Sequence, residues 1–245
     1  MKKFIVLLLV ATLGYFMLDA FFAIDFGINH IKDLGSVSAQ YLVNTKVLKV
    51  ANAVTSIVVN FRGFDTLGEV TVLFLASTGL GSVLFRKRKV HTKLNPRRTS
   101  TESSKILTTA GKILFPMILL LGAYVFIHGH LTPGGGFQGG VIIATGFLLL
   151  LVTFRKFAVN HSTLTWTEAL AGATFAGIGL FGLTVGKNFL ENFLPTGTLN
   201  NLWSGGIIGI IYVAVGFKVA AELTGILDTM LSITVDVEDE ESTEN

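Results

Sequence analysis

Six apolar runs, each long enough or nearly long enough to cross a lipid bilayer, occupy most of the 245 residues. A helix needs roughly 20 residues to span about 30 Å of hydrocarbon. No water-soluble core fits beside these runs, so the sequence predicts an all-α, polytopic membrane protein with six transmembrane helices. The predicted spans are residues 4–24, 66–85, 107–127, 138–154, 166–185 and 202–223.

The composition supports residence in a membrane and restricts the chemistry. Hydrophobic residues make up 51% of the chain and charged residues 14%, whereas a soluble domain has roughly 25% charged residues. The absence of cysteine excludes disulfides, thiolate metal sites and iron–sulfur ligation. No nucleophile, base and oxyanion donor converge in the sequence. We therefore expect a non-catalytic subunit that binds no cofactor and contacts lipid and other membrane proteins, but not nucleic acid.

Basic residues predict the orientation, because lysine and arginine are retained on the cytoplasmic side. They precede the first span, follow the second and follow the fourth, which places all three clusters on one side of six alternating helices. We expect a multi-pass plasma-membrane protein with both termini in the cytoplasm. The first run also begins like a signal peptide, but no small-residue cleavage site follows it, so we expect a retained anchor. The clusters are Lys2 and Lys3; Arg86, Lys87, Arg88, Lys89, Lys93, Arg97 and Arg98; and Arg155 and Lys156.

A polar, basic segment rich in serine and threonine divides the chain at residues 86–105. A boundary near Asn95 gives a two-helix module, residues 1–95, and a four-helix module, residues 96–245. Six acidic residues within 236–244 form a tail that cannot fold alone and that either stays solvated or rests against a basic partner. No internal repeat is visible, which disfavours a self-sufficient transporter built from inverted repeats.

A short amphipathic helix is predicted between the first two spans. Apolar residues recur there at helical spacing, and polar residues fall largely on the other side. The helix either lies in the membrane interface or lines a polar cavity. The apolar set is Val47, Val50, Val54, Ile57 and Val58, and the polar set is Lys46, Lys49, Asn52, Ser56 and Asn60.

Three charged residues, Arg62, Asp65 and Glu69, cluster where the chain enters the second span. Each costs free energy in lipid unless it is paired or hydrated. One interpretation is structural: Thr66 and Glu69 form a capping box, Asp65 suits the start of a helix, and Arg62 neutralises one carboxylate. The other interpretation is that the carboxylates belong to an ion path.

The same residues resemble part of a known family. The stretch of residues 54–72 contains the run Asn60-Phe61-Arg62-Gly63-Phe64-Asp65-Thr66-Leu67-Gly68-Glu69. It resembles the carboxy-terminal part of the large subunit of Mrp-type multisubunit Na+/H+ antiporters. It is also similar to the small separate subunit that replaces that part in membrane-bound hydrogenases. The resemblance implies that Glu69 belongs to a cation path. Family members often have aspartate at the position of Asn60, so this chain lacks one carboxylate of that pattern.

A second resemblance lies between the third and fourth spans. The run is His128-Gly129-His130-Leu131-Thr132-Pro133-Gly134-Gly135-Gly136-Phe137-Gln138-Gly139-Gly140. It looks like the signature of the B subunit of the same antiporters, which also has four spans in the matching part. The two resemblances imply a fused subunit whose partners are other antiporter subunits. They also allow a host complex with an iron–sulfur redox module, as in archaeal hydrogenase or sulfane sulfur reductase complexes.

Proline and glycine predict a break in the backbone at this signature. Pro133 cannot continue the third helix, and Gly134, Gly135 and Gly136 permit positive φ and close backbone approach. The fourth helix would then restart at Phe137 with free N–H groups facing a polar space, unless the segment is only a tight external turn. Two imidazoles are too few for a closed metal site, so we expect His128 and His130 to cap a helix or face water.

Three charges in the second half also admit two interpretations. Glu168 follows Thr165 by three residues, which favours capping of the fifth helix over a proton relay. Lys218 and Glu222 are spaced to meet on one face of the last helix. They either neutralise each other or line a polar half-channel together with Glu168.

The sequence thus predicts a membrane subunit of an Mrp-type module that moves Na+ and H+. Our hypothesis is that Asp65 and Glu69, with help from Lys46 or Lys49, form part of a sodium path at the contact with neighbouring subunits. The alternative is a scaffold subunit in which every charge is a helix cap or a solvated end.

Overall fold

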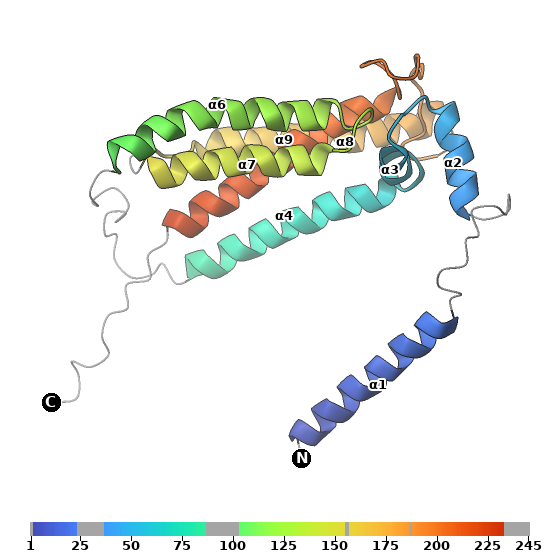
Figure 1. Ribbon diagram of the computed structural model, residues 1–245, viewed down its shortest axis with the longest axis horizontal. Coiled ribbons are helices and arrows are strands. Elements are labelled where there is room, and N and C mark those ends of the chain that lie inside the picture. The colour runs from blue at the N-terminus through green and yellow to red at the C-terminus, as the bar shows by residue number, and fades with distance from the viewer. Residues whose placement is uncertain (1, 24–36, 87–102, 155–156, 187, 233–245) are drawn as a thin grey trace. The chain divides into compact units, whose positions relative to one another are not determined.

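The computed structural model describes residues 2–23, 37–86, 103–154, 157–186 and 188–232, and the regular elements within these ranges are all helices (Figure 1). The prediction of an all-α polytopic membrane protein is confirmed. The contacts divide the chain into two units, residues 1–43 and 44–245, which are described separately. The predicted boundary near Asn95, the basic cluster at 87–98, Arg155 with Lys156, and the acidic tail lie outside the described residues.

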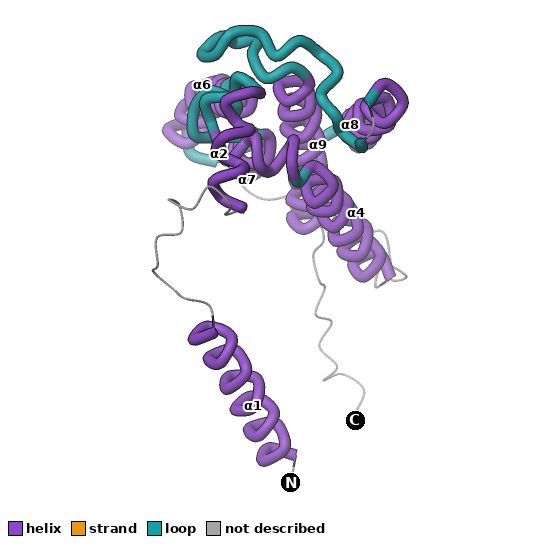
Figure 2. The backbone as a smooth tube through the Cα atoms, turned by 90° about the vertical axis from the view of Figure 1, so that its right-hand side faces the viewer, coloured by secondary structure: helices purple, strands orange, loops and turns teal. Residues whose placement is uncertain are grey.

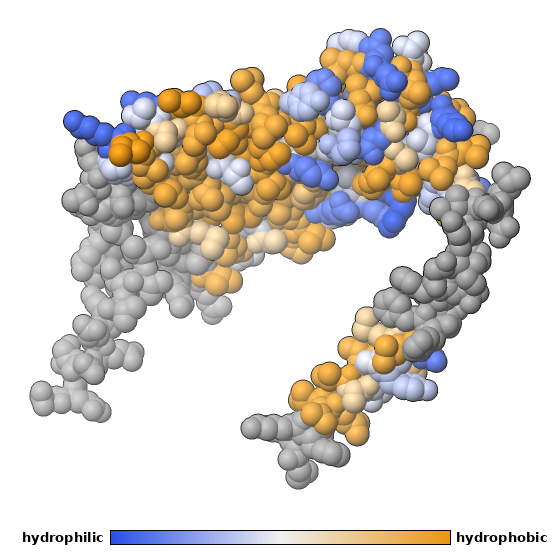
Figure 3. Space-filling view, in the orientation of Figure 1, coloured by the Kyte–Doolittle hydropathy of each residue, from blue (hydrophilic) through white to orange (hydrophobic). Residues whose placement is uncertain are grey.

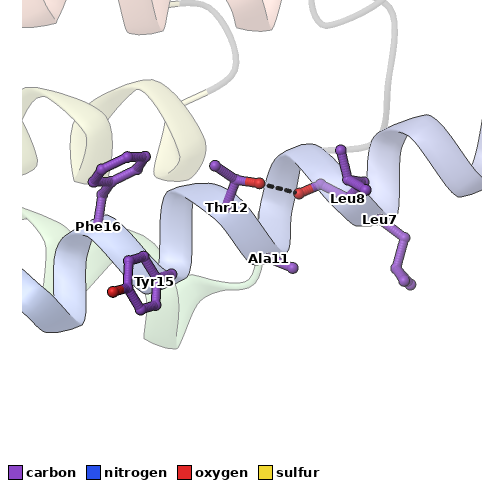
Figure 4. Close-up of a pocket in the computed structure, with 6 residues that line it drawn as sticks. All are labelled: Leu7, Leu8, Ala11, Thr12, Tyr15 and Phe16. Atoms are coloured by element: carbon purple, nitrogen blue, oxygen red, sulfur yellow. Dashed lines mark hydrogen bonds between the residues drawn. The ribbon is translucent and has the colours of Figure 1, made fainter.

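The first unit contains helix α1, Lys2–Ala23. Its apolar section, Val6–Asp19, is shorter than the five long apolar helices of the second unit. Figure 4 shows a shallow groove on α1 lined by Leu7, Leu8, Ala11, Thr12, Tyr15 and Phe16, in which the Thr12 hydroxyl donates to the Leu8 carbonyl at 2.8 Å. The groove is almost entirely apolar, so it suits lipid or a neighbouring helix.

The second unit has five helices long and apolar enough to span a membrane. They are α4 (Gly63–Arg86), α6 (Lys105–Ile127), α7 (Gly136–Thr153), α8 (His161–Val185) and α9 (Ile207–Ser232). Helix α9 is central, because it packs against each of the other four (Figure 2). Its buried apolar face forms the main core and includes Ile207, Ile208, Ile211, Val215 and Val219.

Glycines permit the closest contacts between these helices. A Cβ atom added at Gly140 would lie 2.7 Å from the Gly216 carbonyl oxygen and 2.8 Å from the Val219 Cβ atom. A Cβ atom at Gly139 would lie 2.7 Å from the Gly122 carbonyl oxygen. Small residues let membrane helices approach until van der Waals contacts form along the backbones. Neighbouring glycines of α7 therefore let both α6 and α9 approach this helix closely, and α6 and α9 also contact each other.

Two predicted helix starts are wrong by five residues each. Helix α8 begins at His161, five residues before the predicted start, because the Asn160 side chain accepts hydrogen bonds from the Ser162 and Thr163 backbone N–H groups. Glu168 therefore lies two turns inside the helix and does not cap it. Helix α9 begins at Ile207, later than predicted, because Gly205 and Gly206 adopt positive φ of 82° and 62°.

The predicted amphipathic helix is interrupted. Helix α2 (Val37–Val47) ends before a turn in which Lys49 has a φ of 55°. The chain resumes as the short helix α3 (Ala53–Thr55) and continues into the π-helix η2 (Ser56–Phe61). Of the predicted apolar residues, Val50 is buried, whereas Val47 and Val54 are about two-thirds exposed. The apolar stripe is therefore only partly turned inward.

The surface of the second unit is divided by polarity (Figure 3). Apolar side chains dominate the middle of the helices in this view, and hydrophilic groups gather toward the ends. Many large apolar side chains of α4, α6 and α8 are more than half exposed, among them Phe64, Leu120 and Trp166. Such a band is what a bilayer or adjoining membrane subunits would cover.

Candidate functional site

Three charged side chains meet between α8 and α9, inside the apolar part of the second unit. The Lys218 Nζ atom lies 3.2 Å from Glu222 Oε2, to which it donates a hydrogen bond, and 3.5 Å from Glu168 Oε1. The side chains of Glu222, Lys218 and Glu168 are 0%, 10% and 21% exposed. We call these three residues the charge cluster. This grouping is one of the two arrangements that the sequence allows for Lys218 and Glu222.

Local sequence explains how the charge cluster forms. Lys218 and Glu222 are four residues apart on α9, so they project from the same face. On α8, Gly172 lies opposite the lysine stem: a Cβ atom there would lie 3.7 Å from Lys218 Cδ. The lysine stem thus passes beside Gly172 and reaches Glu168, one turn earlier on α8.

Helix α4 supplies an aromatic side chain to the charge cluster. The Lys218 Nζ atom lies 5.4 Å from the centre of the Phe74 ring, within the range of a cation–π interaction. Helices α4 and α9 also pack directly against each other. Residues from both predicted modules therefore surround the same ammonium group.

The charge cluster has one carboxylate more than it has cations. Glu222 Oε1 is buried and makes no hydrogen bond within the described residues. An unpaired carboxylate oxygen in a low-dielectric interior is costly, and a proton or a small cation at this atom would reduce that cost. Chemically, the cluster is able to hold Lys218 between two carboxylates and to accept one further positive charge.

The charges at the start of α4 have a different environment. The Arg62 Nε atom donates to Asp65 Oδ2 at 2.7 Å, and both side chains are more than half exposed. Thr66 does not form the predicted capping box with Glu69: its hydroxyl donates to the Val58 carbonyl at 2.8 Å, and α4 has already begun at Gly63. Glu69 is exposed.

The two lysines proposed to assist Asp65 and Glu69 are also exposed. Lys46 lies in the last turn of α2, and Lys49 follows in the turn with positive φ. The structure places these four predicted residues on the surface of the chain and does not join them to the charge cluster. The prediction that they form a sodium path remains a prediction.

The signature loop ends α6 and starts α7, as the proline and glycines indicate. Helix α7 begins at Gly136, one residue before the predicted restart. Its glycines are needed for close approach and not for positive φ: a Cβ atom at Gly136 would lie 2.7 Å from the Tyr212 carbonyl oxygen. For Gly134 the nearest atom would be the Val125 carbonyl oxygen at 3.0 Å, and for Gly135 the side-chain oxygen of Gln138 at 2.6 Å. Pro133 is exposed in the loop.

The two histidines of this loop differ. His128 caps the end of α6 and stacks on Tyr124, with 4.4 Å between the ring centres. His130 is 1% exposed, so the expectation that it faces water is wrong. Burial lowers the pKa of His130 below its usual 6.5, and the backbones of Asn201 and Leu202 offset part of that effect. Neither ring nitrogen of His130 makes a hydrogen bond of ordinary geometry with the described residues.

Hydrogen bonds join the signature loop to the segment before α4, a connection that the sequence did not predict. The Asn52 side chain donates to the Gly129 and Thr132 carbonyls at 2.9 and 3.0 Å. The Thr55 hydroxyl donates to the Gly129 carbonyl at 2.7 Å and accepts from the Tyr212 hydroxyl at 2.9 Å. The two family-like segments therefore meet in space through buried polar contacts.

A second pair of ionisable side chains between α8 and α9 is not indicated by any sequence motif. His161 Nε2, at the start of α8, lies 3.0 Å from Asp228 Oδ2, near the end of α9. The His161 side chain is 63% exposed and that of Asp228 is 11% exposed. The described residues contain no group of three or more histidine, cysteine, aspartate or glutamate side chains placed to hold a metal ion.

Two family models match the chain, one on each half. Residues 106–225 match a domain related to the MnhB subunit of Na+/H+ antiporters, and residues 6–100 match MbhE, a component of MBH. A putative antiporter subunit of Staphylococcus aureus, mnhB2, is 30% identical over 142 residues, which cover 56% of this chain and 92% of that protein. The chain belongs to the MnhB-related antiporter subunit family. The resemblance seen in its signature loop is thereby confirmed.

Solved structures extend the match to nearly the whole MnhB-related chain. It is similar to a chain of the membrane-bound sulfane sulfur reductase, an archaeal respiratory membrane complex. The identity is 42%, the TM-score is 0.77, and the match covers 95% of this chain and 99% of that one. The Mrp complex of a Dietzia species matches with a TM-score of 0.66 and 24% identity, over 97% of this chain and 26% of the matched chain. The latter likeness shows a shared fold.

Proposed function

We propose that this MnhB-related subunit takes part in cation translocation, and that the charge cluster of Glu168, Lys218 and Glu222 handles the ion. The observation that carries the proposal is the buried side chain of Glu222, which is bound to Lys218 through one oxygen and left without a partner at the other among the described residues. Ionisable groups inside membrane helices are costly and characteristically mark ion or proton pathways.

The geometry suggests how the charge cluster would work. Lys218 lies at similar distances from the two carboxylates, 3.2 Å from Glu222 and 3.5 Å from Glu168. A proton or Na+ that binds Glu222 would weaken its attraction for the ammonium group, which would then favour Glu168. The ring of Phe74 would stabilise the cation during this shift. The subunit would thus alternate between one state in which the Lys218 ammonium group pairs with Glu222 and another in which it pairs with Glu168.

The test is the variant Glu222→Gln in the assembled complex, reconstituted into vesicles. The amide keeps the size of the side chain but cannot ionise, so we expect sodium-dependent proton movement to be lost while assembly stays normal. Glu191→Gln, which alters an exposed carboxylate in the loop after α8, is the matched control. Undiminished transport in a fully assembled Glu222→Gln complex would remove the charge cluster from the mechanism.

The exposed start of α4 is a second candidate. Asp65 and Glu69 stand at the surface of the chain where a neighbouring subunit can complete a site, and Lys46 and Lys49 are exposed on the segment before it. Loss of transport in Glu69→Gln with a fully active Glu222→Gln complex would favour this location. The scaffold alternative predicts that both variants lower assembly and transport together.

The comparisons support an assembly with other antiporter subunits. The 42% identical chain belongs to a respiratory membrane complex, so we propose a similar host with a separate redox module for this subunit. Both termini would lie in the cytoplasm, as the basic residues indicate. Copurification of iron–sulfur proteins would support the respiratory host, and a preparation with antiporter subunits alone would refute it.

A further inference from the structure

We propose that His161 and Asp228 form the water-facing mouth of a proton path that runs along the contact between α8 and α9 to the charge cluster. This inference rests on the proposed function, because it assigns a route to the same site. Neither the sequence motifs nor the family likeness singles out this pair.

The register of the two helices connects the mouth to the cluster. Helices α8 and α9 lie side by side and run antiparallel (Figures 1 and 2). Later positions on α8 lie beside earlier positions on α9 along this contact. His161 lies 3.0 Å from Asp228, and Glu168 lies 3.5 Å from Lys218. Between these pairs, Leu164 lies beside Gly225, where an added Cβ atom would be 3.7 Å from the leucine side chain.

The distance to be covered is short. His161 and Glu168 are seven residues apart on α8, a rise of about 10.5 Å, and Glu222 and Asp228 are six residues apart on α9, a rise of about 9 Å. Hydrogen-bonded oxygen atoms are about 2.8 Å apart. Roughly two or three water molecules in line would therefore connect Asp228 to the charge cluster.

Two residues of α9 between Glu222 and Asp228 favour the presence of water: one has no side chain and the other has a buried hydroxyl group. Gly225 has no side chain, and a Cβ atom there would meet only Leu164, at ordinary van der Waals distance. Thr224, one turn before Asp228 on the same side of α9, is fully buried, and its hydroxyl has no partner in the described chain. A buried hydroxyl without a partner is the kind of group that ordered water satisfies.

The exposures of the pair fit proton uptake. The imidazole of His161 is mostly exposed and the carboxylate of Asp228 is mostly covered, so the pair leads from the surface of the chain into the contact between the two helices. A proton from bulk water would bind the imidazole nitrogen and pass to the Asp228 carboxylate. It would then travel through the intervening water to a glutamate of the cluster.

The test is chemical rescue in the assembled complex, reconstituted into vesicles and assayed for sodium-dependent proton movement. His161→Ala is expected to slow transport by about tenfold or more, and added imidazole is expected to restore most of the rate. Asp228→Ala should slow transport in the same way, with rescue by formate, which fits the space left by the missing carboxylate. Ser162→Ala, which alters the neighbouring exposed residue, should have no effect and serves as the control.

The outcomes separate this inference from the proposed function. If the His161→Ala complex is fully active and the Glu222→Gln complex is inactive, the proposed proton entry at His161 and Asp228 is refuted. The proposed role of the charge cluster then still stands. A slow His161→Ala complex that imidazole does not rescue would also overturn it, because the pair would then act only in structure. A fully active Glu222→Gln complex would overturn the function on which the inference depends.

Discussion

Removal of the Lys218 ammonium group tests whether the charge cluster is held together by its charges. Lys218→Met keeps the apolar stem but leaves Glu222, with no exposed side-chain surface, and Glu168 facing each other without a cation. Breaking a buried ion pair by removing one partner costs about 3–5 kcal/mol. The double variant Lys218→Met/Glu222→Gln removes both charges of the pair, and its cost should fall to about 1–2 kcal/mol.

The double variant should therefore be at least about 1 kcal/mol more stable than Lys218→Met, and any cost of Glu222→Gln alone adds to the coupling between the two positions. The assay is the thermal midpoint at which the purified complex releases this subunit. Lys218→Met should lower that midpoint clearly, and the double variant should recover much of the loss. Lys46→Met, which alters an exposed lysine, is the control. The reasoning is refuted if Lys218→Met behaves like the control, or if the double variant is as unstable as the sum of the two single variants.

Three further predictions concern packing and the signature loop. Gly140→Ala should destabilise the subunit by about 1–3 kcal/mol, because the new Cβ atom would lie 2.7 Å from a carbonyl oxygen; Gly177→Ala, with no atom within 4 Å, should be nearly neutral in the same thermal assay. Tyr212→Phe should cost about 1 kcal/mol in that assay by removing the hydrogen bond to Thr55, and a neutral result would contradict its role. Because the pKa of His130 is lowered below 6.5 on folding, the unfolded chain binds protons more readily there, so stability present above about pH 6.5 should be lost as the pH falls. His130→Gln should flatten this slope in midpoints measured across the acidic range, and an unchanged slope would refute the assignment.

Features that depend on local sequence were predictable. Apolar length indicated the membrane helices, and Pro133 with the following glycines indicated the break before α7. The start of α8 was missed because Thr165 and Glu168 imitate a capping box, whereas the chain uses Asn160 five residues earlier. Local patterns of this kind identify possible caps but do not choose among them.

Features that depend on distant contacts were not predictable. The bond from Asn52 to Gly129 joins residues 77 positions apart, and nothing in either segment specifies the other. Glu168 was interpreted as a cap because its partner Lys218 lies on another helix, and only the register of α8 against α9 brings them together. The exposed position of Glu69 likewise follows from how α4 packs and not from its motif.

The central claim is that Glu222 changes its charge state during transport, and infrared difference spectroscopy of the reconstituted complex measures this most directly. Adding sodium to the sodium-free complex should produce a carboxyl band that is present in the Glu69→Gln complex and absent in the Glu222→Gln complex. A spectrum without a carboxyl change, or one that survives unaltered in Glu222→Gln, would contradict the account.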